Sequence, residues 1–211
     1  MKKIFLVLFS CSVFLGTIQA QMSAVEMASQ LTDAETFLNN CSFVKEENLS
    51  KYIDNGLEIY GKVYTNLETG EKIGALKFYT QNKEALAGFV NFLSAASGVN
   101  TVPADGSAKP LGYLDMSQVS DLLKALQRIV DMTNTKSSFD YTISYTAKGG
   151  IDVFYNSVER KLVFQKKWYS TNVYGVQSAN YIASTEITLK KVAKLISAIK
   201  DAQDIVNSQL Q

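Results

Sequence analysis

The stretch FDYTISYTAKGGIDVFYNSVERKLVFQKKWY, residues 139–169, decides the fold class. In its first part, apolar or aromatic residues alternate with polar ones. The apolar and aromatic side chains therefore fall on one face: Phe139, Tyr141, Ile143 and Tyr145. A period of two is typical of a half-buried β-strand. Gly149 and Gly150 suit a tight turn, after which strands over Ile151–Ser157 and Leu162–Tyr169 continue an antiparallel meander.

Outward from this stretch, the rest of the chain shows either the same alternation or the three- and four-residue spacing of amphipathic helices. Further strands are predicted over Leu57–Tyr64, over Ile73–Tyr79 and within Asn172–Ser184. Helices are predicted over Ser23–Leu38, Leu86–Ala96, Asp115–Val130 and Thr188–Ser208. Residues 39–56 fit a hairpin or a short helix, and 98–112 are predicted to form a loop. The fold class is therefore α+β, with antiparallel β-meanders and amphipathic helices packed on one face.

A strand followed by a helix occurs twice. When Val119 is aligned with Leu189, the next apolar positions of the first helix fall on apolar positions of the second: Leu122, Leu123, Leu126 and Ile129 on Val192, Ala193, Ile196 and Ile199. Any two amphipathic helices align in this way. Two interpretations therefore stay open, a single α+β domain over 21–211 and two related strand–helix sub-units over 21–135 and 136–211.

The first 20 residues have the layout of a secretory signal peptide. Lys2 and Lys3 precede the mostly apolar run Ile4–Ile18, and Ala20 is the expected last residue before cleavage. The run of about 15 residues is shorter than the roughly 20 that a membrane-spanning helix needs. We therefore expect residues 1–20 to direct export through the inner membrane to the periplasm or the outside of the cell, with no transmembrane segment in the mature chain.

Composition excludes several kinds of chemistry. The chain has no histidine, and cleavage after Ala20 leaves Cys41 as the one cysteine. Ser-His-Asp and Cys-His catalysis need an imidazole base, and structural zinc sites need several Cys or His ligands. We therefore predict no cofactor, no metal site and no catalytic residue. The 21 basic and 20 acidic residues form no concentrated basic face, so nucleic acid is not an expected partner.

Aromatic residues give the strongest indication of a ligand. Ten of them lie between Phe139 and Tyr181. The candidate ligand-binding residues are Trp168, Tyr169, Tyr174, Lys166 and Lys167, because aromatic planes beside polar donors suit sugars and other flat ligands. The alternative is that most of these aromatics fill the core of a sheet. A second candidate region is the polar face of the open antiparallel sheets, with Thr142, Ser144, Tyr60 and Tyr64.

These observations favour a non-catalytic binding or interaction protein of the bacterial envelope, with an envelope glycan or a protein as partner. One alternative is a carboxylate-based hydrolase acting on glycans, which needs two acids facing each other across a cleft. The spacing of the acidic residues selects no such pair. The other alternative is a structural or assembly component that pairs through the edge of a sheet.

Overall fold

The computed structural model describes residues 30–54, 56–80, 108–134, 139–171 and 177–211, without the side chains of Lys109 and of 168–183. The elements in chain order are α2 (Asp33–Asn40), β1 (Val44–Asp54), β2 (Leu57–Asn66), β3 (Lys72–Thr80), β4 (Lys109–Asp115), α4 (Met116–Thr133), β5 (Thr142–Thr146), the short 3-10 turn η1 (Lys148–Gly150), β6 (Ile151–Asn156), β7 (Lys161–Thr171), β8 (Gln177–Thr188) and α5 (Leu189–Leu210). The leader 1–20, the expected helix 86–96 and Tyr174 lie outside the described residues.

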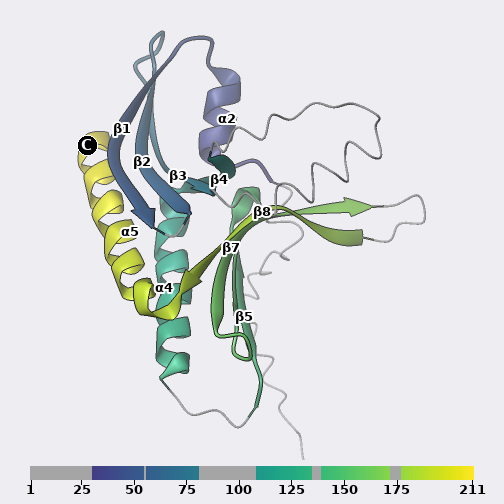
Figure 1. Cartoon of the computed structure of the whole chain (residues 1–211). Helices are drawn as coiled ribbons and strands as arrows, with labels where there is room; N and C mark the ends of the chain where they lie inside the picture. Colours follow the sequence, from purple (N-terminus) through teal and green to yellow (C-terminus); the bar gives the residue numbers. More distant parts are fainter. Residues whose placement is uncertain (1–29, 55, 81–107, 135–138, 172–176) are drawn as a thin grey trace, which may run out of the picture.

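The strands form two antiparallel four-stranded sheets (Figure 1). Sheet A has the order β1-β2-β3-β4 and sheet B the order β5-β6-β7-β8, so that each sheet is a meander of strands consecutive in the chain. Each sheet is followed directly by a long helix, α4 after sheet A and α5 after sheet B. The predicted α+β class is confirmed, and the order of four strands and a helix occurs twice.

The strand registers of the two repeats correspond. Phe78 of β3 lies opposite Ile59, and Phe164 of β7 lies opposite Val153 in the same place of sheet B. The two phenylalanine rings, both fully buried, stack on each other with centroids 6.1 Å apart and planes 13° apart. The equivalent central strands of the two sheets therefore meet in one core.

The long helices correspond as well, although not in the alignment that the sequence suggested. Counted from the start of each helix, Val119 corresponds to Val192 and not to Leu189. The following buried positions then match: Leu122 with Leu195, Leu126 with Ile199 and Ile129 with Ala202. The difference of three residues is close to one helical turn, so both alignments superimpose the apolar stripes, and the stripe alone does not fix the register.

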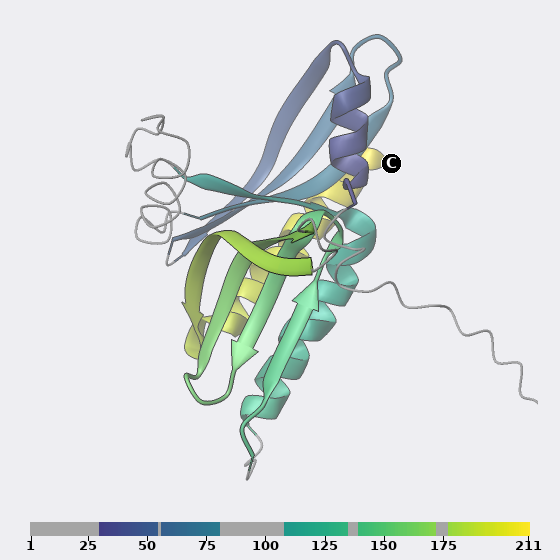
Figure 2. The ribbon, with the colours of Figure 1, turned by 90° about the vertical axis from the view of Figure 1, so that its right-hand side faces the viewer.

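The helix of the second repeat covers the sheet of the first. Helix α5 packs on β1, β2 and β3, while α4 runs beside α5 and against β5 (Figure 2). The approach of α5 is close, because a Cβ atom on Gly61 would lie 3.1 Å from a methyl carbon of Val206. We call the face of sheet A on which α5 packs its inner face. None of the helices in the described ranges is long and apolar enough to cross a bilayer.

Helix α2 begins later than expected. Thr32 is its N-cap and forms a capping box, in which the Thr32 hydroxyl accepts a hydrogen bond from the Glu35 amide (3.1 Å) and the Glu35 carboxylate accepts one from the Thr32 amide (2.8 Å). The prediction of a helix over Ser23–Leu38 is therefore wrong at 30–32, and residues before 30 lie outside the described part. The capping box fixes the start of the helix at this point, because it satisfies amides that would otherwise bond to carbonyls of a preceding helical turn.

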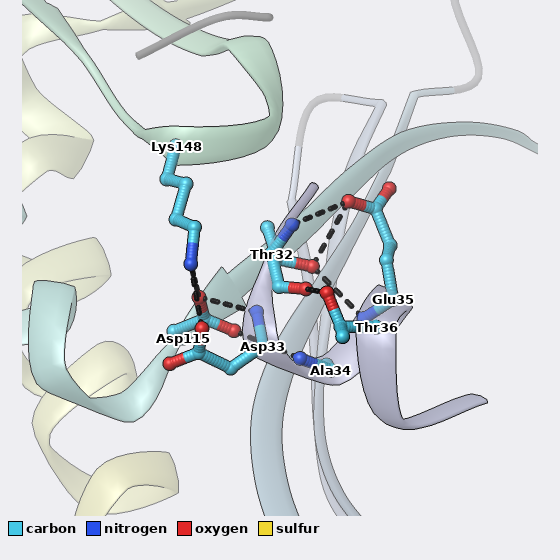
Figure 3. A network of polar contacts seen from close by, with 7 residues as sticks. All are labelled: Thr32, Asp33, Ala34, Glu35, Thr36, Asp115 and Lys148. Carbon is cyan, nitrogen blue, oxygen red and sulfur yellow. Dashed lines mark hydrogen bonds and ion pairs between the residues drawn. The ribbon is translucent and has the colours of Figure 1, made fainter. Parts of the chain in front are cut away.

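The first turn of α2 is fixed to both repeats (Figure 3). At the end of β4, the Asp115 carboxylate accepts hydrogen bonds from the amides of Asp33 (2.8 Å) and Ala34 (3.1 Å). From η1, the Lys148 ammonium lies 2.5 Å from Asp33 and 4.0 Å from Asp115. Helix α2 therefore packs on β3 and β4 on the outer face of sheet A, opposite the face that α5 covers.

One strand had been left open and another was not predicted. For residues 39–56 the hairpin is confirmed over the short helix, because β1 pairs antiparallel with β2 from Asp54 and Leu57 onward, with a register shift between Asn48 and Ser50. The predicted loop 98–112 is wrong from Lys109 onward, because β4 begins there. Pro110 is tolerated in β4 because this is an edge strand, and a register shift in β3 lies opposite it.

Candidate functional site

The two predicted ligand-binding lysines make internal contacts. The Lys166 ammonium donates a hydrogen bond to the carbonyl of Gly149, and a Cβ atom on Gly112 would lie 3.2 Å from it. Burial lowers the pKa of Lys166. The Lys167 ammonium lies 3.6 Å from the carboxylate of the buried Asp152. Both lysines therefore connect β7 to neighbouring elements of the fold.

The predicted aromatic residues lie farther along the same strand. Trp168 pairs with Asn180 and Tyr169 with Ala179, beyond a register shift between Gln165 and Lys167. This shift interrupts the alternation between the two faces of β7. The side chains of Trp168 and Tyr169, and all of Tyr174, lie outside the described residues, so their role in binding stays a prediction.

A different surface brings lysines and aromatic rings together, the outer face of sheet A. We call it the tyrosine–lysine face, and it consists of Lys51, Tyr60, Lys62, Tyr64, Lys77, Tyr79 and Tyr113. In its central row Tyr60 lies between Lys51 and Lys77 on the neighbouring strands, and Lys77 lies between Tyr60 and Tyr113. The row crosses three strand spacings, about 14 Å. The sequence analysis named Tyr60 and Tyr64 of this face and missed the others.

Lys77 is the central cation of this face. Its ammonium lies 4.8 Å from the ring centroid of Tyr113 and 5.3 Å from that of Tyr79, within the range of cation–π attraction. Burial alone lowers the pKa of Lys77, but contacts with the phenols of Tyr113 and Tyr79 outweigh burial, so that its pKa is raised. Among the described residues no carboxylate forms an ion pair with Lys77. This half-buried ammonium is therefore stabilised by rings and phenols alone.

The other two lysines of the face differ in this respect. The Lys62 ammonium forms an ion pair with Glu46 and lies 5.5 Å from the ring centroid of Tyr60. The Lys51 ammonium lies 5.1 Å from the same centroid, and the Tyr60 hydroxyl donates a 2.6 Å hydrogen bond to Glu58. Lys62 is therefore paired with a carboxylate, whereas Lys77 forms no ion pair within the described residues.

Tyr64 carries a second group without a partner. Its side chain is 1% exposed, and its ring lies 6.0 Å from that of Tyr113 at 72°. The hydroxyl makes no hydrogen bond within the described part of the chain. Burial, followed by the neighbouring Tyr113 phenol, raises the pKa of Tyr64. A buried donor without a partner therefore lies beside the ring that flanks Lys77, and such a group costs about 1–3 kcal/mol of stability.

Replacing Tyr64 by phenylalanine is expected to raise the free energy of unfolding of the ligand-free protein by about 1 kcal/mol, because the unsatisfied hydroxyl is removed. Tyr145→Phe is the matched control, since the Tyr145 hydroxyl donates to the Gln118 carbonyl (3.3 Å). The control is expected to lose about 1 kcal/mol. Guanidinium denaturation measures both, and equal losses in the two variants would contradict the described environment of Tyr64.

Alkaline pH is expected to destabilise the protein. Burial raises the pKa of Tyr64 and Tyr145, and burial followed by the Asp54 carboxylate raises that of Tyr52 to about 12. The ordinary value is 10.0, so the unfolded chain releases these protons first. Their contribution to stability is complete below about pH 10 and is lost as pH rises through the folded values. Denaturant titrations at rising pH measure the fall, and a flat profile above pH 10 would contradict it.

Among the side chains that the structure describes, the equivalent row of sheet B lacks the tyrosine–lysine pattern. In its equivalent row Phe154 replaces Tyr60, Val163 replaces Lys77 and Glu186 replaces Tyr113. Beside this row, the buried Asp152 carboxylate accepts hydrogen bonds from Thr146 (2.6 Å) and Gln165 (2.7 Å). These described polar groups of sheet B therefore satisfy one another, whereas Lys77 of sheet A has phenols and no carboxylate as partners in the described residues.

A small pocket lies at the other end of the molecule, between the C-terminal end of α4 and the turn after β6. It has a volume of about 240 Å³ and is lined by residues that include Asp140, Tyr155 and Arg160. Asp140 is the one carboxylate among the described lining residues, whereas hydrolysis of a glycosidic bond generally needs two. No cluster that could hold a metal ion occurs in the described ranges.

In the described part of the chain, two buried side-chain oxygens lack a hydrogen-bond partner, that of the Tyr64 hydroxyl in the tyrosine–lysine face and the Oε1 of Gln118 on α4. A scan against protein-family models and a search of curated proteins give no match for this chain.

Proposed function

We propose that the protein is a non-catalytic binding protein that acts in the bacterial envelope after export, and that its ligand contacts the tyrosine–lysine face. One observation carries the proposal. The Lys77 ammonium lies over the rings of Tyr79 and Tyr113 without a carboxylate partner in the described residues, and the Tyr113 ring also contacts that of Tyr64, whose buried hydroxyl has no hydrogen-bond partner there. A ligand at this face is expected to supply an acceptor for the Lys77 ammonium.

The alternative of assembly through a sheet edge has less support. The edge strand β1 carries the charged side chains Lys45, Glu46, Glu47 and Lys51 and a register shift between Asn48 and Ser50. Charges and bulges on an edge strand oppose pairing with another chain. This arrangement favours recognition by the face of sheet A over pairing through β1.

The test of the proposal uses the tyrosine rings as reporters. Isotope-labelled tyrosine in the mature protein is followed by NMR during titration with separate fractions of envelope glycans and peptides. We expect a ligand to shift the signals of Tyr60, Tyr79 and Tyr113 and to leave Tyr145 and Tyr155, on the inner side of sheet B, unchanged. Assignment uses single Tyr→Phe variants. A ligand that binds without shifting any tyrosine of this face would sink the proposal.

A matched pair of variants separates the face from general charge. Lys77→Met removes the central cation, whereas Lys161→Met removes an exposed lysine of sheet B that pairs with Glu186 (3.0 Å). Both change the net charge equally. Loss of binding in Lys77→Met alone supports the proposal, and equal loss in both variants contradicts it.

A further inference from the structure

We infer that the ligand of the tyrosine–lysine face is an acidic saccharide whose carboxylate is bound beside Lys77 and Tyr64. This inference rests on the proposed function and gives the chemical class of the ligand. It depends on three features of the described residues: the groups that the face offers, the position of these groups in the sheet, and the contrast with sheet B.

The groups around Lys77 are hydrogen-bond donors. The ammonium offers three N–H bonds and no lone pair. The unpartnered Tyr64 hydroxyl has a proton to donate, and burial followed by the Tyr113 phenol raises its pKa, which keeps the proton in place. The acids of the face are engaged elsewhere, Glu46 with Lys62 and Glu58 with the Tyr60 hydroxyl. A cation and a buried donor without an acceptor are complementary to a carboxylate.

The position of the face in the sheet favours a saccharide over a peptide. A peptide that adds to a sheet pairs with an exposed edge through its main chain. The tyrosine–lysine face is centred on β2 and β3, the two inner strands of sheet A, whose main chains already pair on both sides. Recognition there depends on side chains alone. Phenol rings offer flat apolar surfaces for the faces of sugar rings, and hydroxyls and ammonium groups offer hydrogen bonds.

The arrangement of the rings agrees with an extended ligand. The rings of Tyr60 and Tyr79 meet edge to face at 5.5 Å, and those of Tyr64 and Tyr113 do so at 6.0 Å, so that the two ring pairs flank Lys77. The central row is about 14 Å long, which accommodates more than one sugar ring. The row is therefore long enough for several sugar units, with one carboxylate held near its middle.

The equivalent row of sheet B carries different residues at the positions of the anion-binding groups. In sheet B the position of Lys77 is occupied by Val163 and that of Tyr113 by Glu186. Val163 gives an anion no donor, and the Glu186 carboxylate repels it. Among the described side chains, this row of sheet B therefore lacks the groups of the anion site.

The test compares two probes with the same sugar backbone. Trigalacturonate carries carboxylates, and its methyl ester is neutral. Calorimetric titration of the mature protein is expected to give at least about tenfold tighter binding of the acid, the size expected for a hydrogen bond to a charged group. In Lys77→Met this preference is expected to disappear, and in Lys77→Arg, which keeps the charge, to remain. Lys161→Met is expected to behave like the original protein.

Each other result has its own meaning. Equal affinity for acid and ester, with shifts at the tyrosine rings, overturns the anion site and leaves the proposed binding function standing. Binding of polyglutamate in place of both sugars overturns the assignment to saccharides. Absence of binding of any of the three probes overturns the inference, and the separate NMR titration then decides the proposed function. Tyr64→Phe is expected to weaken binding of the acid while the free protein becomes more stable, which a purely structural role of Tyr64 does not produce.

Discussion

Replacing Phe164 by alanine is expected to lower the free energy of unfolding by about 3–5 kcal/mol, the range for truncating a buried phenylalanine. Phe164 is fully buried and stacks on Phe78, which occupies the equivalent position in the other repeat. The variant therefore opens a cavity where the two sheets meet, and removes one half of an aromatic pair. Guanidinium denaturation followed by circular dichroism measures the loss.

A double-mutant cycle isolates the contact between the two rings. Phe78→Ala is expected to lose a similar amount, and the double variant less than the sum of the single losses, by about 0.5–1.5 kcal/mol. Phe154→Ala is the control, because Phe154 lies half-buried on the outer face of sheet B. Strict additivity of Phe78→Ala and Phe164→Ala would show that the two repeats do not share this core.

The second large effect is expected at Asp115. Asp115→Ala removes the acceptor of the Asp33 and Ala34 amides at the start of α2, and it removes the buried partner of Lys148. Leaving buried amides without an acceptor costs about 1–3 kcal/mol each, so a loss of about 2 kcal/mol or more is expected. Hydrogen exchange of the Asp33 and Ala34 amides is expected to accelerate, since their bonds are broken directly.

Two further variants test this explanation. Thr32→Ala removes the local cap of the same helix and is expected to cost about 1 kcal/mol, less than Asp115→Ala. Asp115→Asn keeps one acceptor oxygen and is expected to fall between the original protein and Asp115→Ala. If Asp115→Ala were as stable as Thr32→Ala, the long-range cap from β4 would contribute little, and α2 would depend on its capping box alone.

The strands and long helices could be predicted because their patterns are local. Alternation in 57–64 and 139–146 reflects the two faces of a strand, and the apolar stripe of α4 reflects burial of Val119, Leu122, Leu126 and Ile129. The interpretation of sheet aromatics as core also holds for Phe164, which is fully buried, and for Tyr145, which packs against the core.

The elements that were missed or left open depend on features that break a local pattern or lie far apart in sequence. The register shift at Asn48 and Ser50 obscures the alternation of β1, and Pro110 suggests a loop although β4 accommodates it at the edge of the sheet. The capping box at Thr32 and Glu35 was visible in the sequence but was not used. The hydrogen bonds from the start of α2 to Asp115 could not be predicted from a local pattern, because Asp115 lies 82 positions after Asp33 in the sequence.

The tyrosine–lysine face could be predicted only in part for the same reason. Tyr60 and Tyr64 were recognised because they alternate within one strand. Lys77 and Tyr113 come from β3 and β4, and their position beside Tyr60 depends on strand registers that the sequence pattern does not specify. That no described carboxylate forms an ion pair with Lys77 is likewise a property of the assembled sheet. The sequence analysis instead selected the aromatic cluster around Trp168, whose role stays a prediction.

The packing of α5 on sheet A has a consequence for the order in which the protein is completed. The first sheet is closed by the last helix, since Val206 and Ala202 lie against Gly61. During synthesis from the N-terminus, the strands up to Asp115 leave the ribosome long before residues 189–210 do. The nascent chain therefore lacks the helix that buries one side of its first meander until translation is nearly finished, and under the proposed export this delay would keep the chain unfolded for translocation.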